Sequence, residues 1–349
     1  ASGLRVGETG SAFLLRQTLA GPVTAANGTR TSELVAGGGV AQAAFLIAQG
    51  VRGNGTPVIV ANGFSPFYFQ PYPQYTGAVN VIDSNDRSRY NALEIQLSRR
   101  LSRGFSFQAS YTLAKSEDTR SFDPAFAVAN RATSTTSNPG QSAANTPFDI
   151  RNRDLNYARS DFDRRHAVQG YALFELPFGR ERRFASDLPT VLDRIIGGFE
   201  IAGIIRYYTG RPFTVYSGVN TLSQVVQTPA NCNNCSPDLG RIVQESGTNF
   251  YFTAEQRALF SAPAPGEFSN TGRNFFTGPP FFNLDMTLGK RIRFDESRNL
   301  ELRLEAQNAT NTPSFDFPTT GLANSTFGRV RDGVVSSSRK VQIAAKFNF

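Results

Sequence analysis

Strict alternation of apolar and polar residues is the feature that most limits what this chain can fold into. Apolar or aromatic residues occupy every second position from Phe105 to Leu113, and Ser, Gln and Thr fill the positions between them. A period of two places the apolar side chains on one face of a β-strand. The same alternation, clean in some segments and weaker in others, predicts strands at 76–82, 92–98, 105–113, 168–176, 199–208, 282–289, 300–307 and 341–349.

A soluble β-sandwich and a membrane barrel both alternate in this way, and the polar faces of their strands separate them. The polar phase carries charged or amide groups in nearly every predicted strand, as Glu301, Arg303 and Glu305 illustrate. Such side chains suit a water-filled lumen, where opposite charges on neighbouring strands pair. No apolar run approaches the ~20 residues that a membrane helix needs, so the sequence excludes a helical membrane protein.

The predicted connections alternate between short and long. Short or moderate connections lie at 100–103, 177–196 and 295–298, and long ones lie at 116–163, 217–279 and 310–338. Structureless loops of that length are uncommon in compact soluble domains, whereas outer-membrane barrels combine short periplasmic turns with long extracellular loops. The predicted fold class is all-β: part of an antiparallel, transmembrane outer-membrane β-barrel with about eight strands, located in the cell outer membrane.

The last predicted strand gives the direction of the others. Its apolar positions, ending on an aromatic C-terminal residue, resemble the signal read by the barrel-assembly machinery: Val341, Ile343, Ala345, Phe347 and Phe349. An ordinary amphipathic edge strand is the alternative interpretation. If Phe349 lies at the periplasm, every long connection lies outside the cell and every short one lies in the periplasm.

The formal net charge of +8 indicates either nucleic acid or an anionic membrane surface as a partner. Much of the basic excess lies at the short connections: Arg99, Arg100, Arg103, Arg180, Arg182, Arg183, Lys290, Arg291, Arg293 and Arg298. This placement favours outer-membrane lipids, with the cations facing anionic headgroups, and no nucleic-acid partner is expected. Solvated turn charges explain each cation equally well. Aromatic residues at the strand ends predict an interfacial girdle: Tyr207, Tyr208, Phe213, Tyr216, Phe281, Phe282 and Phe294.

The two cysteines, Cys232 and Cys235, are separated by two asparagines. They do not complete a four-ligand zinc site, because the single histidine, His166, lies far away in sequence. A local disulfide in an oxidising compartment is the favoured interpretation. A reduced pair without a role and a thioredoxin-like redox site are the alternatives.

Catalysis finds little support in the sequence. No nucleophile elbow accompanies His166, which we interpret as a polar residue at the outer rim of a strand. Asp118, Asp123 and Asp149 lack the spacing of a calcium loop and are interpreted as solvated loop acids. The chain is therefore not expected to be an enzyme, and no catalytic residue, metal or cofactor is predicted.

Residues 1–75 are interpreted as a loop-rich segment of the barrel, and residues 76–349 as barrel strands and loops. The glycine-rich stretches 37–39 and 53–55 do not make a phosphate loop, because no Lys-Ser/Thr follows them. The chain opens at Ala1 with no signal peptide. We therefore expect the natural protein to begin further upstream and this chain to be a fragment or a trimmed product.

Several motifs, in their order and spacing, resemble the C-terminal part of a TonB-dependent receptor barrel of the Oar-like, acidobacterial type. They lie at 88–94, 107–116, 163–166, 175–179, 210–213, 305–308, 311–313 and 346–349, within a resemblance that covers roughly residues 66–349. The resemblance implies a large barrel, closed by an N-terminal plug, that imports a scarce ligand with energy delivered by TonB. No plug or TonB-contacting segment is visible, so contact with TonB implies a plug region missing from this sequence.

Two functions follow from these expectations. The first is the barrel portion of a TonB-dependent receptor, which binds and imports an unknown extracellular ligand. Its ligand contacts would come from the long loops and from lumen residues such as Glu94, Glu200, Arg206 and Arg303. The alternative is a non-transporting surface or adhesin-type barrel whose loops bind partners.

Overall fold

A computed structural model describes residues 84–121, 147–149, 152–180, 182–218, 221, 227–264, 267–295, 297–330 and 338–349. The segment 1–75 and the predicted strand at 76–82 lie outside these residues.

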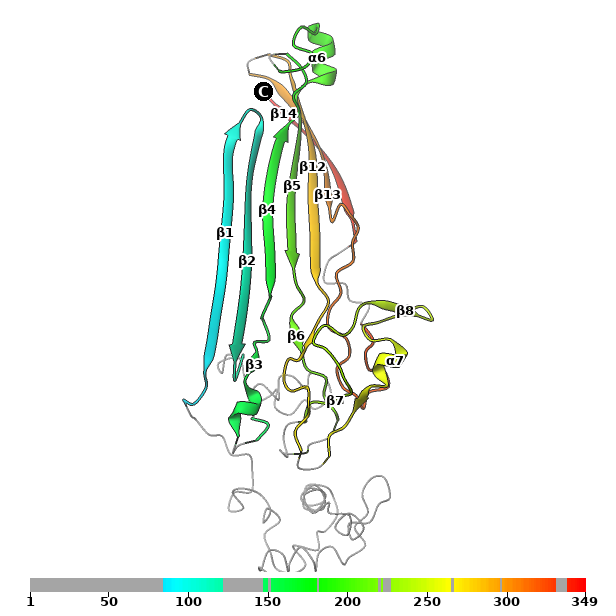
Figure 1. The fold of residues 1–349 in the computed structure, drawn as a ribbon. Helices are drawn as coiled ribbons and strands as arrows, with labels where there is room; N and C mark the ends of the chain where they lie inside the picture. The colour runs from blue at the N-terminus through cyan, green and yellow to red at the C-terminus, as the bar shows by residue number, and fades with distance from the viewer. Residues whose placement is uncertain are drawn as a thin grey trace, which may run out of the picture.

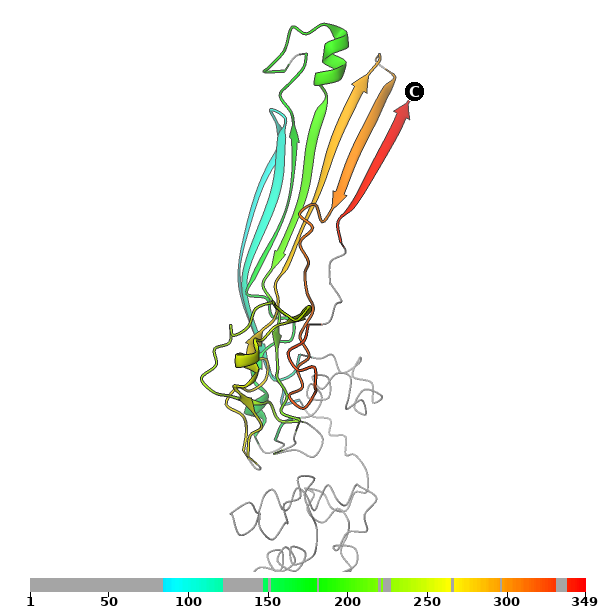
Figure 2. The same ribbon diagram turned by 90° about the vertical axis from the view of Figure 1, so that its right-hand side faces the viewer.

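One curved antiparallel sheet dominates the described chain (Figures 1 and 2). Its long strands, in spatial order, are β1 (Ser88–Ser102), β2 (Phe105–Asp118), β4 (His166–Glu175), β5 (Phe199–Tyr208), β12 (Phe281–Arg293), β13 (Asn299–Gln307) and β14 (Lys340–Asn348). Each long strand pairs with the next long strand along the chain, and the two-residue β3 (Ala158–Arg159) pairs with the end of β2. The antiparallel all-β prediction is confirmed, and the eighth strand of the described sheet is this short β3.

The strand register sorts side chains onto two unlike faces. On the polar face, Glu301 of β13 lies between Arg291 of β12 and Lys346 of β14. The apolar face carries large side chains that remain open, among them Leu93 with 55% of its surface exposed and Ile343 with 80% exposed. A soluble sheet would cover such a face with a second layer. Open apolar side chains over a whole sheet instead suit contact with lipid.

The two ends of the sheet differ, and we call them the turn end and the loop end. At the turn end, β1 and β2 are joined by Arg103 and Gly104, both in the left-handed region, with φ of 53° and 76°. This two-residue turn keeps the two strands tightly paired. The turn end also carries the connections from β4 to β5 and from β12 to β13, together with the C-terminus (Figure 1).

The β4–β5 connection contains a short helix that the sequence analysis did not predict, α6 (Thr190–Ile196). Lys290 of β12 stabilises the end of this helix, because its Nζ donates to the carbonyls of Ile195 at 2.7 Å and Gly197 at 2.9 Å. Val191 and Ile195 nevertheless stay largely exposed, at 68% and 61%. The helix therefore presents apolar side chains outward at the turn end.

The long connections gather at the loop end, where their described parts are folded. They contain the 3₁₀ helix η2 (Arg153–Asn156), the helix α7 (Ala254–Arg257) and three short antiparallel pairs. The paired strands are β6 (Pro212–Phe213) with β11 (Phe276–Thr277), β7 (Asn231–Cys232) with β10 (Phe260–Ser261), and β8 (Val243–Glu245) with β9 (Thr248–Phe250). The predicted long loops therefore contain short helices and strand pairs of their own.

An aromatic core explains why these loops fold. Phe252 is fully buried, and its ring lies 5.2 Å from the Phe260 ring and 5.7 Å from the Phe276 ring, measured between centroids. Phe213 and Phe327 complete the contacts around it at 6.2 and 6.0 Å. Aromatic burial of this kind dominates the energy of a core. We call this folded part of the loop end, which includes η2, α7 and the three short strand pairs, the cap.

The described sheet does not close into a barrel. β1 and β14 lie at opposite ends of the strand order, so each keeps one edge without a partner strand among the described residues. The described helices include none that is both long and apolar enough to cross a membrane.

Candidate functional site

Charged side chains on the polar face form a set of ion pairs. Arg206 of β5 contacts Asp285 of β12 at 3.2 Å. Arg291 contacts Glu301 on the neighbouring strand, also at 3.2 Å, and Arg303 contacts Glu305 at 3.5 Å. These half-exposed pairs keep the face wet and charged rather than contributing much stability, since exposed ion pairs are worth about 0–1 kcal/mol.

The register puts all four of the predicted lumen residues on the polar face but does not bring them together. Glu200 and Arg303 lie on the same level, on either side of Gly289. Glu94 lies near the β1 edge, opposite Thr112. A Cβ at Gly289 would approach the Glu200 Cγ to 2.7 Å, so the glycine leaves room for the glutamate side chain. No single binding site contains all four.

The buried polar centre of the cap is an ion pair between Asp118 and Arg273. Nη2 of Arg273 donates to the Asp118 carboxylate and, at 2.7 Å, to the Asp118 carbonyl oxygen. Ser121 donates to the same carboxylate at 2.9 Å. The interpretation of Asp118 as a solvated loop acid was therefore wrong, because its carboxylate is buried and paired with the guanidinium of Arg273 from a distant loop. Asp149 is among the described residues, and Asp123 lies outside them.

Arg159 ties β3 to the segment around β11. Its guanidinium donates to the Asn274 carbonyl at 3.1 Å, the Phe275 carbonyl at 2.5 Å and the Thr277 hydroxyl at 3.0 Å. Burial lowers the pKa of Arg159, and the carboxylates of Asp163 and Asp238 oppose that shift. The cap is thus held to the end of the sheet by two arginines as well as by its aromatic core.

The residues of the predicted aromatic girdle divide among four environments. Phe213 and Tyr216 are buried in the cap, so their assignment to the girdle was wrong. Tyr208 and Phe281 are paired in register, with their rings 5.7 Å apart between centroids, and lie on the polar face. Phe294 is exposed at the turn end. Tyr207 and Phe282, one position along, lie on the apolar face, where a girdle contacts lipid.

Cys232 and Cys235 are joined by a disulfide, with their Cα atoms 5.6 Å apart. Cys232 is buried in the aromatic core of the cap. His166 is the first residue of β4, and its Nδ1 shares a hydrogen bond of 2.9 Å with the Tyr111 hydroxyl. Within the described part of the chain, no cluster of three or more His, Cys, Asp or Glu residues has the proximity that a metal site requires.

Several of the basic residues at the turn end have protein partners. Arg182 pairs with Glu175 at 2.9 Å, and Arg298 pairs with Asp295. Hydrogen bonds from Arg298 lower the pKa of Asp295 to about 2. Arg100, Arg103 and Arg293 form no ion pair with a described carboxylate. Arg293 lies on the polar face, two residues beyond Arg291, whereas Arg100 and Arg103 at the β1–β2 turn are available for an anionic surface.

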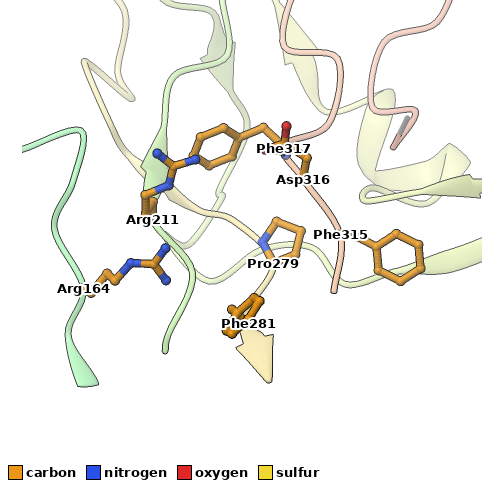
Figure 3. A pocket seen from close by; sticks show the side chains of 7 residues that line it. All are labelled: Arg164, Arg211, Pro279, Phe281, Phe315, Asp316 and Phe317. Atoms are coloured by element: carbon orange, nitrogen blue, oxygen red, sulfur yellow. Dashed lines mark hydrogen bonds between the residues drawn. The ribbon is translucent and has the colours of Figure 1, made fainter. Parts of the chain in front are cut away.

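A pocket opens at the junction of the sheet and the cap, and we call it the mouth pocket (Figure 3). It is lined by Arg164, Arg211, Pro279, Phe281, Phe315, Asp316 and Phe317. Arg164 precedes β4, and Arg211 follows β5. Figure 3 shows both arginine side chains on one side of the pocket, with Pro279 and Phe315 on the other. Phe281 belongs to the polar face, so the pocket lies where that face meets the cap.

Two glycines allow the backbone arrangement behind this pocket. A Cβ at Gly210 would lie 1.7 Å from the carbonyl oxygen of Gly278. A Cβ at Gly278 would lie 2.8 Å from the Phe317 ring. Only residues without a side chain permit such a close approach, which places Arg211 beside the segment that carries Phe317.

The mouth pocket was not predicted from the sequence, although two of the sequence motifs supply its arginines. Arg164 lies in the 163–166 motif and Arg211 in the 210–213 motif. The register of β4 and β5 pairs Ala167 with Tyr208. Each arginine lies three residues beyond this pair, so a prediction of the register would have brought the two motifs together.

A comparison with known protein families agrees with the sheet and its two faces. A family model described as an outer membrane beta barrel domain matches residues 28–342. No curated protein and no solved structure matches the chain. The match spans most of the sequence, and the antiparallel strands with one polar and one open apolar face are those of a transmembrane barrel. The chain belongs to the outer membrane β-barrel domain family, and it is located in the outer membrane.

Proposed function

We propose that this chain is the barrel portion of a TonB-dependent receptor, which binds and imports a scarce extracellular ligand in the full-length protein. The observation that carries this proposal is the open sheet with a charged face. The long strands form a continuous wall, yet β1 and β14 each keep a free edge among the described residues. An unpaired backbone group in hydrocarbon costs several kcal/mol. Further strands must therefore complete the barrel.

The open edges of the described sheet support a complete barrel with more strands and a wide lumen. A barrel of about eight strands is filled by its own side chains, whereas larger barrels enclose a channel or a plug. The described sheet is still open at this size, which favours the larger class. A charged polar face such as that formed by Arg206, Asp285 and Glu301 suits a hydrated lumen.

We place the loop end outside the cell and the turn end in the periplasm. The cap would then meet the ligand first, and the mouth pocket would lie at the entrance to the lumen. The proposed partners are TonB, acting through a plug region, the barrel-assembly machinery, acting on β14, and the lipids of the outer membrane. Arg100 and Arg103, at the β1–β2 turn, would face the periplasmic leaflet.

The proposal is tested with the full-length gene product. The purified receptor is mixed with the periplasmic domain of TonB, and co-purification is measured for the intact protein and for a variant that lacks the proposed TonB-contacting segment. We expect binding that the deletion abolishes. A complete reading frame without a plug, or an intact protein that does not retain TonB, would refute coupled import.

One observation favours the alternative of a surface barrel that binds partners through its loops. The cap has its own aromatic core, built around Phe252, and so offers a stable extracellular surface. A surface barrel of this kind would bind its partner equally well in cells that lack TonB, whereas import would stop.

We propose a binding role rather than a catalytic one. His166 is engaged by the Tyr111 hydroxyl, and the rings of the two residues stack at 6.1 Å between centroids. A screen of hydrolase substrates comparing the wild type with His166→Ala tests this point. An activity present in the wild type and lost in the variant would contradict it.

A further inference from the structure

The mouth pocket concentrates positive charge without a matching carboxylate. Arg164 donates one hydrogen bond from Nη1 to the Thr209 carbonyl at 3.1 Å. The guanidinium of Arg211 forms no hydrogen bond to another described residue and lies over the Phe317 ring, 4.8 Å from its centroid. Neither arginine is in an ion pair with a described carboxylate. Since a guanidinium has five N–H donors, most of those in this pocket have no partner in the described chain.

The one acid that lines the mouth pocket is engaged locally. The Asp316 carboxylate accepts the backbone N–H of the next residue, Phe317, at 2.8 Å. Burial, followed by the charge of Arg211, lowers the pKa of Arg164. An anion placed between the two guanidiniums would relieve this repulsion.

Aromatic rings hold both guanidiniums. Arg164 lies over the Tyr208 ring at 4.9 Å, in addition to the contact of Arg211 with Phe317. Stacking on a ring fixes the plane of a guanidinium and leaves its N–H edge free for an oxyanion. Two such edges in one pocket match the planar, bidentate geometry of a carboxylate.

The size of the pocket limits what enters it. Its volume is about 60 Å³, less than half of the ~150 Å³ of a buried cavity that holds one benzene molecule. This volume accommodates a carboxylate head group but not a whole ligand. The rest of the ligand would lie against the apolar walls formed by Pro279, Phe281 and Phe315, towards the polar face of the sheet.

We propose that Arg164 and Arg211 form a binding site for the carboxylate of a ligand that also carries a flat apolar group. The site selects anionic ligands at the entrance to the barrel and orients them with the apolar part towards the lumen. This inference rests on the proposed ligand-binding role of the mouth and is independent of coupling to TonB.

The test measures binding directly, so that its failure and the failure of coupled import can be told apart. The full-length protein is purified in detergent, and ¹⁹F NMR line broadening is recorded for 4-fluorobenzoate and for its neutral analogue 4-fluorobenzamide. We expect broadening of the benzoate signal alone. Replacing either arginine, as Arg164→Gln or Arg211→Gln, should weaken benzoate binding roughly tenfold or more, because each removes a charge-assisted contact.

Arg241→Gln is the matched control, since Arg241 is an exposed arginine of the cap outside the pocket. Heat-modifiable mobility checks that each variant is folded. Arg211→Lys keeps the charge without the planar fork and should retain part of the affinity. Equal broadening of benzoate and benzamide, or equal binding by the wild type and the two pocket variants, would overturn the proposal.

Discussion

Arg273 and Asp118 form a buried ion pair although they are 155 positions apart in the sequence. The side chain of each is only 3% exposed. Asp118 is the last residue of β2, and Arg273 lies just before β11. The pair therefore joins the end of the membrane sheet to the centre of the cap.

We predict that Asp118→Asn destabilises the cap by about 3 kcal/mol, because it leaves the Arg273 charge buried without its main counterion. The partial contact of Arg273 with Asp161, at 3.7 Å, remains. Urea-induced loss of near-ultraviolet circular dichroism, which reports the packed aromatic rings, is the measurement. Glu267→Gln is the matched control, since Glu267 is an exposed acid of the same cap and forms no ion pair with a described residue. Equal midpoints for the two variants would contradict the prediction.

The alternation of apolar and polar residues was enough to predict those parts of the strands in which contact with lipid requires an apolar face. The segment 199–208 coincides with β5. β1 and β2 extend beyond their predicted ends, because polar residues such as Ser88 and Glu117 continue the backbone pairing past the apolar band. The 15 residues of β1 span about 50 Å at ~3.4 Å per residue. This exceeds the ~30 Å hydrocarbon core, so the strand continues beyond the membrane without needing an apolar face there.

The cap was missed for a physical reason. Phe252 and Phe327 come from irregular segments, and Phe276 comes from the two-residue strand β11, so none of them lies in a stretch with a period of two or of 3.6 residues. Their contacts join parts of the chain that are far apart in sequence, and a local pattern does not encode such contacts. The pair of Asp118 with Arg273 is of the same kind, whereas the meeting of Arg164 with Arg211 follows from the register of β4 and β5.

The two faces of the sheet can be tested with a single-tryptophan pair, because the chain has no native tryptophan. Ile204 and Ile205 are neighbours on β5, 50% and 38% exposed, and lie on the polar and apolar faces respectively. We expect Ile205→Trp to be quenched by brominated lipid acyl chains and Ile204→Trp by aqueous iodide. The two variants match in residue type, strand and depth, so each is the control for the other. Quenching of both by lipid would rule out a hydrated lumen at this position.

Helix α6 gives a second prediction about lipid, at the turn end. Val191 is exposed on a helix that contains Arg194 and follows a turn with Arg182 and Arg183, which is the composition of a segment that lies in a lipid–water interface. We expect the emission of Val191→Trp to shift to shorter wavelength when the full-length protein is moved from detergent into vesicles containing anionic phospholipid. Ser186→Trp, in the exposed loop before the helix, is the control and should keep the emission of a solvated indole. An unshifted spectrum for Val191→Trp would leave the helix in water.

The terminal strand offers the last prediction. β14 pairs with β13 along nine residues, and Phe347 of its apolar face lies between Phe294 and Phe349, with ring centroids 6.1 and 6.2 Å away. Phe349 itself is 96% exposed, so it contributes little to the packing of the described chain. Its removal should therefore leave the folded barrel about as stable as before and act instead on assembly.

We predict that deleting Phe349 from the full-length protein lowers its yield in the outer membrane, while the fraction that assembles keeps its heat-modifiable mobility. Lys346→Gln, on the polar face of the same strand, is the control and should assemble normally. If the deletion left the membrane yield unchanged, the C-terminal pattern would be that of an ordinary edge strand. If it lowered the unfolding temperature of the assembled protein as well, Phe349 would instead have a packing role, in contacts beyond the described sheet.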